Sequence, residues 1–137
     1  MKIKLDPGAC APERAHPEDA GLDLRAIESD TVLPGEGVVF RTGVHAEIPD
    51  GCCGLLVSKS GLNVAYGVTS TGLIDQNYTG EILVKLYNHG SLPFVVSEKQ
   101  KISQLVILPC LRPDIEIVDE LPAVSGRGDA GFGSSGK

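Results

Sequence analysis

The sequence has few basic residues and no run of lysine or arginine. It contains 12 basic and 18 acidic residues, which give a formal net charge of −6 and a pI near 4.9. A surface that coats DNA or RNA takes its affinity from clustered Lys and Arg that neutralise phosphates. The composition therefore argues against a nucleic-acid-binding protein, although a small anion still fits a local basic pocket.

Long apolar runs are also absent. No stretch continues far enough to span a bilayer, and the first residues, MKIKLDPGA, lack the apolar segment of a secretory signal peptide. We therefore expect a cytoplasmic protein that does not associate with membranes.

The four cysteines lack the spacing of a metal or redox motif. Cys10, Cys52, Cys53 and Cys110 form no C-x-x-C pair, and no histidine lies at a spacing that suits zinc. A chain of 137 residues buries enough surface to fold without a disulfide. We expect free, mostly buried thiols.

Gly and Pro leave little room for helices. The 17 glycines and 9 prolines are spread so evenly that only residues 22–33 and 94–108 run for more than ten residues without one. This spacing is incompatible with long helices. With 42% apolar and 22% charged residues, and without an internal repeat or linker, the chain is predicted to form one globular domain.

Short apolar or alternating runs between turn signals predict an all-β sandwich or barrel. Alternation is clear in residues 82–87, and again where Ile115 and Ile117 stand between charged neighbours. Residues 94–108 are predicted as strand, turn and strand, because SEKQK divides two runs rich in Val, Ile and Leu. One short helix is predicted from Leu62 to Tyr66.

The C-terminal residues 125–137, SGRGDAGFGSSGK, contain five glycines and one aromatic residue. They cannot build a strand or pack a core, so they are predicted to form a mobile tail. Glycines let a tail fold over an occupied site, which makes Arg127 a candidate to bind phosphate and Phe132 a candidate to stack on a base. Terminal disorder without a function is the plain alternative.

Two segments in the first half of the chain carry candidate polar residues. Asp23 stands between two leucines, where the solvent face of a strand and a functional carboxylate explain it equally well. In Ser58-Lys59-Ser60-Gly61, an apolar run stops at hydroxyls, a cation and a glycine, which suits a phosphate-sized anion. For so short a motif, a plain strand-to-helix cap is the better-supported interpretation.

Residues 72–82, GLIDQNYTGEI, form the most specific segment. They predict a β-hairpin with Asp75 and Tyr78 near its bend. Its backbone groups and rigid aromatic ring suit a flat polar base or a sugar, whereas a turn-forming aspartate and a cross-strand aromatic are the plain alternatives. Gln104, set among branched apolar residues, is either an amide donor to phosphate or a surface residue of an edge strand.

Taken in order, AGLDLRA, SKSGL, GLIDQNYTGEI, KISQLVILP and RGDAGFGSSG closely resemble the five motifs of the homotrimeric dUTPase family. The resemblance implies a small jelly-roll-like β-barrel over residues 1–124, with residues 125–137 as a flexible arm that closes over the active site. It implies a dUTP diphosphatase, in which water attacks the α-phosphorus of dUTP to give dUMP and pyrophosphate, with Mg²⁺ on the triphosphate. Three chains of a homotrimer would form the active sites at their interfaces.

Position by position, the resemblance assigns catalysis to Asp75, which orients the attacking water, and to Arg127, which binds phosphate. Tyr78 packs beneath the deoxyribose and leaves no room for a 2′-OH. Asp23 belongs to the network around the metal and contacts Mg²⁺ only through water. The other implied substrate contacts are Lys59, Ser60, Gly61, Gly72, Gln104, Phe132 and Ser134.

The sequence departs from the family pattern in three motifs. Lys59 stands where the family usually has arginine, so a bidentate contact becomes a point charge. Asn77 replaces the common second acid of the third motif. Asp129, followed by Ala130, places a negative charge next to Arg127.

Two other functions stay open. A dCTP deaminase of the same fold group would use a glutamate, for which Glu81 is the candidate, although such chains tend to be longer. The second is a non-catalytic β-sandwich module that binds a nucleotide or a protein partner.

Overall fold

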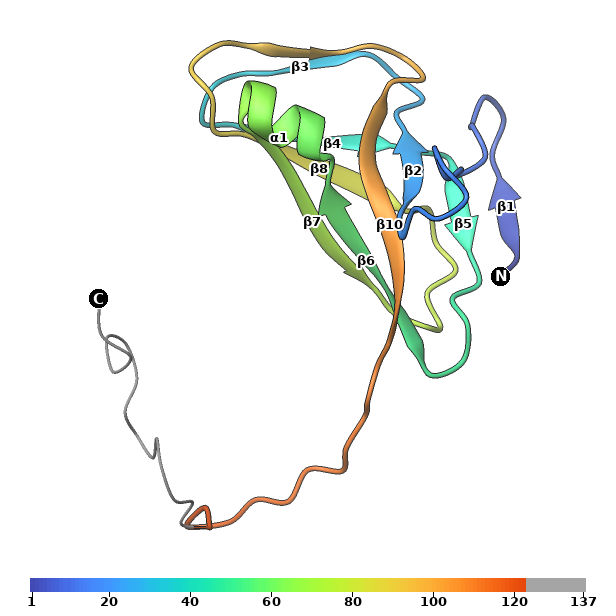
Figure 1. Cartoon of the computed structure of the whole chain (residues 1–137), viewed down its shortest axis with the longest axis vertical. Coiled ribbons are helices and arrows are strands. Elements are labelled where there is room, and N and C mark those ends of the chain that lie inside the picture. The colour runs from blue at the N-terminus through green and yellow to red at the C-terminus, as the bar shows by residue number, and fades with distance from the viewer. Residues whose placement is uncertain (123–137) are drawn as a thin grey trace.

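The computed structural model describes residues 1–122, in which ten strands and one short helix form the regular secondary structure (Figure 1). The elements in this range are β1 (Ile3–Leu5), β2 (Leu22–Arg25), β3 (Asp30–Val32), β4 (Gly37–Arg41), β5 (Val44–Ala46), β6 (Cys52–Ser58), α1 (Ser60–Tyr66), β7 (Val68–Ile74), β8 (Leu83–Asn88), β9 (Phe94–Val96) and β10 (Lys101–Pro109). The predicted all-β class is confirmed. The only helix in this part of the chain, α1, is far too short and polar to cross a membrane.

A six-stranded antiparallel sheet in the order β2-β10-β6-β7-β8-β4 forms most of the domain. This sheet curls into a half-barrel, and two small two-stranded sheets, β1-β5 and β3-β9, complete it. In Figure 1, the β3-β9 pair crosses the end of the barrel that carries α1, while β1 and β5 stand beside β2. The small β-barrel that the sequence predicts is therefore confirmed.

The core forms where strands alternate between the two faces of the sheet. In β8, Val84 and Leu86 are buried, whereas Leu83 and Lys85 face outward, as the alternation in the sequence predicts. Every strand of the large sheet contributes at least one buried side chain to a single core cluster, in which Phe40 of β4 is the largest side chain. The largest of the other covered side chains are Leu24, Ile82, Ile102 and Leu105.

Two local predictions in the second half of the chain are confirmed. Residues 94–108 form β9 and β10 with a turn between them. The predicted short helix forms as α1, and it ends at Gly67, whose φ of 68° is left-handed and whose N–H donates to the Asn63 carbonyl.

The predicted strand around Ile115 and Ile117 is wrong. Residues 110–122 contain neither strand nor helix and run away from the barrel in Figure 1. Ile115 and Ile117 are 91% and 95% exposed, because no strand in the described part of this chain lies beside them. Alternation alone could not show where their partner surface lies.

The cysteines are free thiols, as expected, but they are half-buried rather than mostly buried. Cys52 and Cys53 lie in β6, and the backbone N–H of Cys110 donates to the Gly51 carbonyl just beyond the end of β10.

Candidate active site

Asp23 is a buried carboxylate held by two lysines. Its Oδ1 lies 2.6 Å from Lys59 Nζ and its Oδ2 lies 2.7 Å from Lys101 Nζ, while the side chain of Asp23 is only 2% exposed. Gln104 Nε2 donates a longer hydrogen bond, 3.4 Å, to Oδ1. We call Asp23, Lys59, Lys101 and Gln104 the lysine-aspartate cluster.

The interpretation of Asp23 as a solvent-facing strand residue is therefore wrong. β2 is covered on its outer edge by the preceding segment, where the Asp23 N–H donates to the Glu13 carbonyl at 2.7 Å. On its other side it pairs with β10, which places Gln104 directly opposite Asp23. β10 lies between β2 and β6, so the alternative of Gln104 as an edge-strand residue is also wrong.

Electrostatics keep Asp23 charged despite its burial. Burial raises the pKa of Asp23, but the hydrogen bonds and charges of Lys101 and Lys59 outweigh it, so the pKa lies below the ordinary value. The same contact with Asp23 raises the pKa of Lys101. The cluster therefore holds two cations around one anion and carries a net positive charge.

Lys101 is a member of the cluster that the sequence did not single out. Lys101 and Gln104 are three positions apart, which in a regular strand puts them on opposite faces. A register shift between Lys101 and Ser103 moves both side chains to the same carboxylate. Lys101 itself was visible in the sequence, but the bulge that brings it to Asp23 was not.

Ser60 and Gly61 open α1 directly after Lys59, at the end of β6. Both are exposed, and no side chain caps the start of this helix. A strand therefore leads directly into a helix here, as the plain interpretation of this segment requires. However, no side chain caps that helix. Next to it, Ser58, Ser70 and Ser103 form a hydrogen-bonded layer, with 2.8 Å between the hydroxyls of Ser70 and Ser103.

The second group of candidates lies on the loop between β7 and β8, residues 75–82, which we call the β7-β8 loop. Asp75 and Tyr78 are both exposed there, and the Tyr78 N–H donates to the Asp75 carbonyl at 3.1 Å. The Tyr78 hydroxyl donates to the Glu81 carbonyl at 2.9 Å. The ring passes over Gly80 so closely that any Cβ at that position would overlap it.

β7 and β8 form a hairpin, as predicted, but its paired part lies outside residues 72–82. β7 pairs with β8 only over residues 68–70 and 86–88, far from the bend, while Gly72 and Ile74 pair with β6 instead. A hollow of about 240 Å³ lies at the bend, lined by Leu73, Ile74, Asp75, Tyr78, Glu81 and Leu83. Asp75 and Tyr78 therefore share one concave surface.

The lysine-aspartate cluster and the β7-β8 loop lie at opposite ends of the β6-β7 ladder. Gly54 pairs with Ile74 at one end, and Val57 pairs with Thr71 toward the other, where Lys59 follows. This register places Asp75 level with Cys53, six residues before Lys59, so at about 3.3 Å per residue the two are separated by roughly 20 Å along the strands. Within residues 1–122 of a single chain, the two groups do not meet.

The described residues do not fit a magnesium ion held by protein ligands alone. No group of three or more His, Cys, Asp or Glu side chains in residues 1–122 is arranged to hold a metal. Both oxygens of Asp23, the carboxylate that the resemblance links to Mg²⁺, are taken by ammonium groups. Since Mg²⁺ usually keeps several waters and binds substrate phosphates, an ion that arrives on a triphosphate fits this donor set better.

Arg127, Phe132 and Ser134, with the rest of the predicted arm, lie outside the described residues. So do Asp129 and Ala130.

Comparisons with known proteins agree on one family. The dUTPase family model matches residues 8–136. The deoxyuridine 5'-triphosphate nucleotidohydrolase of Clostridium acetobutylicum is 41% identical over 140 residues, which cover 99% of this chain and 96% of the relative. The enzyme of the same name from a Picosynechococcus species is 42% identical, with 98% of this chain and 96% of the relative covered.

Solved structures give the same result. The dUTPase of Staphylococcus bacteriophage 80alpha with dUpNHpp superposes with a TM-score of 0.92 at 32% identity and covers 99% of this chain and 98% of its own. A mutant dUTPase from phage phi11 of S. aureus, described with a coordinated structural Mg(II) ion, has a TM-score of 0.80 at 29% identity, with 87% and 96% covered.

Proposed function

Because the chain belongs to the dUTPase family, we propose that it hydrolyses dUTP to dUMP and pyrophosphate by attack of water at the α-phosphorus. The observation that carries the proposal is the β7-β8 loop, where Asp75 and Tyr78 line one hollow. A carboxylate beside an aromatic platform suits a deoxynucleoside with a water in line for attack.

In this proposal Asp75 orients the attacking water and accepts its proton. Its exposed position allows a water and the deoxyribose 3′-OH to reach it. Tyr78, fixed by its bond to the Glu81 carbonyl, packs beneath the sugar and excludes a 2′-OH. The main chain of the hairpin from Gly72 onward reads the uracil.

The lysine-aspartate cluster serves the phosphates. Lys59, Ser60, Gly61 and Gln104 converge at one end of β6 and β10, where a net positive charge offsets the triphosphate. Asp23 holds Lys59 and Lys101 in place and would meet Mg²⁺ only through water. When bound, the ion would supply charge neutralisation for the phosphates.

The arm completes the site. We assign residues 1–124 to the barrel domain and residues 125–137 to an arm that closes over bound substrate. There Arg127 binds phosphate, Phe132 stacks on the base, and Ser134 adds a substrate contact. An arginine fork suits phosphate oxygens, and closure would exclude bulk water.

The separated groups support a homotrimer whose active sites lie between subunits. One chain places Asp75 and Lys59 at opposite ends of the same ladder, so a complete site takes them from different copies. The exposed apolar side chains of residues 111–121 provide a surface for such contacts. They are Leu111, Ile115, Ile117, Val118 and Leu121.

A complementation experiment tests the shared site. Asp75→Asn chains and Gln104→Ala chains are each expected to be nearly inactive, but co-refolded mixtures regain activity, because some sites receive an intact residue from each chain. Random assembly of equal amounts restores about a quarter of the sites. Mixtures that stay as inactive as their components would refute the shared site.

Pyrophosphate release from dUTP, dTTP, dCTP and UTP, with and without Mg²⁺, tests the reaction. We expect selective, Mg²⁺-dependent turnover of dUTP, and equal turnover of all four would refute the proposal. Ammonia release from dCTP would indicate the deaminase instead. That role is disfavoured because the Glu81 carboxylate is bound by Arg41 Nε at 3.0 Å and by the Gly43 N–H at 2.8 Å. Tight dUTP binding without turnover would indicate the non-catalytic module.

We place this reaction in the cytoplasm. The four free thiols fit a reducing compartment, where disulfides are rare.

A further inference from the structure

The β7-β8 loop is held by contacts with residues outside the hairpin, because the hairpin's own backbone pairs stop at residue 70. Near its start, Gln76 Nε2 donates to Asp50 Oδ1 at 2.6 Å. Near its end, the Ile82 N–H donates to the Val44 carbonyl and the Ile82 carbonyl accepts from the Thr42 hydroxyl. The anchor in the middle is His45.

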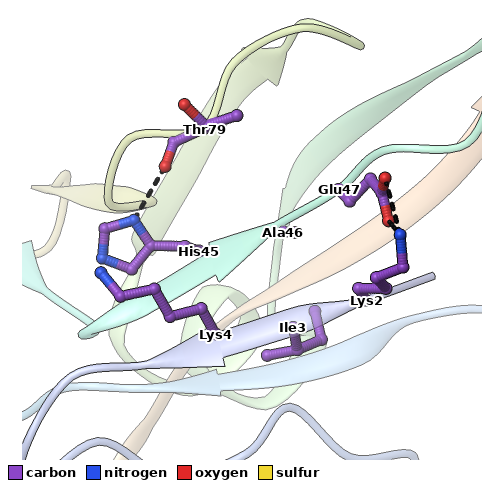
Figure 2. Close-up of a pocket in the computed structure, with 7 residues that line it drawn as sticks. All are labelled: Lys2, Ile3, Lys4, His45, Ala46, Glu47 and Thr79. Carbon is purple, nitrogen blue, oxygen red and sulfur yellow. Dashed lines mark hydrogen bonds and ion pairs between the residues drawn. The ribbon is translucent and has the colours of Figure 1, made fainter.

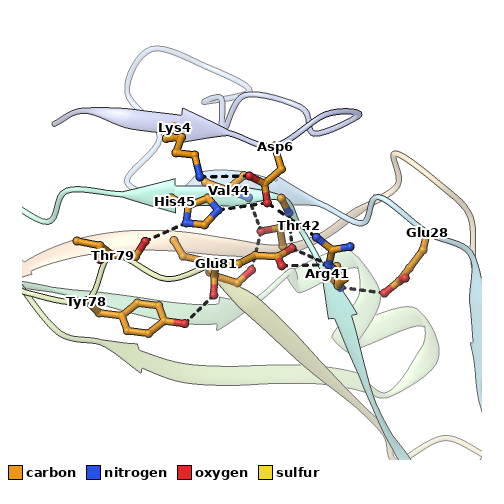
Figure 3. A network of polar contacts seen from close by, with 12 residues as sticks. Lys4, Asp6, Glu28, Arg41, Thr42, Val44, His45, Tyr78, Thr79 and Glu81 are labelled. Carbon is orange, nitrogen blue, oxygen red and sulfur yellow. Dashed lines mark hydrogen bonds and ion pairs between the residues drawn. The ribbon is translucent and has the colours of Figure 1, made fainter.

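His45 of β5 binds the loop and the N-terminal segment at once (Figure 3). Its Nδ1 lies 2.9 Å from the Thr79 carbonyl, one residue after Tyr78, and its Nε2 lies 3.2 Å from Asp6 Oδ2. Both partners are acceptors, so both ring nitrogens must carry a hydrogen to satisfy them. This double contact requires the imidazolium form.

The charges around the ring favour that form on balance. The Thr79 carbonyl and the Asp6 carboxylate raise the pKa of His45, while burial and the neighbouring Lys4 oppose them. Asp6 also contacts Lys4 at 3.4 Å and Arg41 at 3.8 Å. The His45 side chain is only 17% exposed, although it borders a hollow of about 300 Å³ lined by Lys2, Ile3, Lys4, His45, Ala46, Glu47 and Thr79 (Figure 2).

A second set of contacts strengthens the same region. Near the end of the loop, the Glu81 carboxylate accepts hydrogen bonds from Arg41 Nε and from the Gly43 N–H. Arg41 reaches back toward Asp6, which closes the network around His45. Of the side chains that anchor the loop, His45 alone changes protonation near neutral pH.

We propose that His45 is a positioning residue that, through the Thr79 carbonyl, keeps Asp75 and Tyr78 in the arrangement that binds the deoxynucleoside. The inference rests on the proposed function and adds to it a proton-dependent control of substrate binding. A neutral imidazole donates only one hydrogen bond, so as pH rises His45 loses either its bond to the Thr79 carbonyl or its bond to Asp6, and the link between the loop and the N-terminal segment is broken. Substrate affinity then falls, while the chemical step in the filled site changes little.

The test compares His45→Ala with His45→Asn. Alanine removes the anchor, and we expect KM for dUTP to rise about fivefold to tenfold with kcat nearly unchanged. In asparagine, Nδ2 takes the place of Nδ1 and donates to Thr79 at any pH, so KM is expected to return to near the wild-type value. His16→Ala, at an exposed histidine outside the network, is the matched control and is expected to behave as wild type.

The pH profile separates positioning from mere structural support. We expect KM of wild type to rise from pH 6 to pH 9 relative to KM of His45→Asn, a ratio in which the titration of dUTP itself cancels. Equal pH profiles for the two proteins, or a His45→Asn variant as impaired as His45→Ala, would overturn the proposal.

Hydrogen exchange of residues 75–82 in the full-length free protein gives a readout independent of turnover. Exchange is expected to be faster in His45→Ala and close to wild type in His45→Asn. If wild type fails to hydrolyse dUTP, the proposed function fails, while exchange still reports whether His45 holds the loop. Unchanged exchange and KM in His45→Ala, with active wild type, would refute the role of His45 alone.

Discussion

Replacing Asp23 by asparagine removes the one negative charge between two lysines. The ammonium groups of Lys59 and Lys101 lie 2.6 Å and 2.7 Å from the carboxylate, which is almost wholly buried. Asparagine keeps the volume and one acceptor oxygen but offers an N–H₂ group to at least one lysine. The substitution therefore leaves two cations facing each other without their counter-ion.

The expected loss is smaller than for a fully buried pair. Removing one partner of a buried ion pair costs about 3–5 kcal/mol. Here the lysine side chains are 23% and 28% exposed, so both can turn toward water, and Lys101 lies 3.5 Å from Glu13 as a second partner. We therefore expect Asp23→Asn to lower the free energy of unfolding by about 1–3 kcal/mol at pH 7.

Urea unfolding at fixed protein concentration measures this loss, with Glu18→Gln, at an exposed acid outside residues 111–121, as the control. The folded-state pKa of Asp23 lies below its ordinary value of 3.8, so its contribution is complete above that pH and disappears as pH falls through the folded-state pKa. The difference between wild type and variant should therefore be constant near neutrality and shrink in acid. No difference at pH 7, or a difference undiminished in acid, would refute the reasoning.

Three further predictions concern the proposed reaction. Asp75→Asn should lower kcat by about 10²–10⁴-fold while dUTP binding, measured by calorimetry, persists; full activity would show that the carboxylate is incidental. Gly80→Ala should displace the Tyr78 ring and reduce the preference for dUTP over UTP in pyrophosphate release, whereas an unchanged preference would argue against the ring as the sugar platform. Deleting residues 126–137 should reduce turnover strongly with an unchanged urea transition, and a fully active truncation would exclude the arm.

The strands were predictable because their burial is decided by near neighbours. In β8, two-residue alternation defines one buried face, and the sheet has that face, while β10 was predicted from its run of Val, Ile and Leu after the turn signal SEKQK. The helix α1 was predictable for a similar reason, since Gly67 ends it in a left-handed conformation. Neither prediction depended on which strands pair with one another.

The lysine-aspartate cluster was only partly predictable, because its geometry depends on strand pairing. Asp23, Lys59 and Gln104 were visible as odd polar residues, but the burial of Asp23 comes from the segment at Glu13 on one side and β10 on the other. Lys101 contacts Asp23 because of a register shift in β10, which no pattern in the sequence predicts. His45 was missed for the same reason, because its partners lie 39 and 34 residues away.

The predicted strand around Ile115 and Ile117 does not form, and the two groups of site residues lie apart. Both findings have the same explanation. Alternating apolar residues indicate a surface that is buried on one face, and in the described part of this chain nothing covers them. The β6-β7 ladder likewise keeps Asp75 apart from Lys59, a separation that folding of one chain cannot remove. The homotrimer proposed above would account for both, because a neighbouring copy would cover the apolar segment and complete the site. On that proposal, the alternation indicates a surface that is buried only in the assembly.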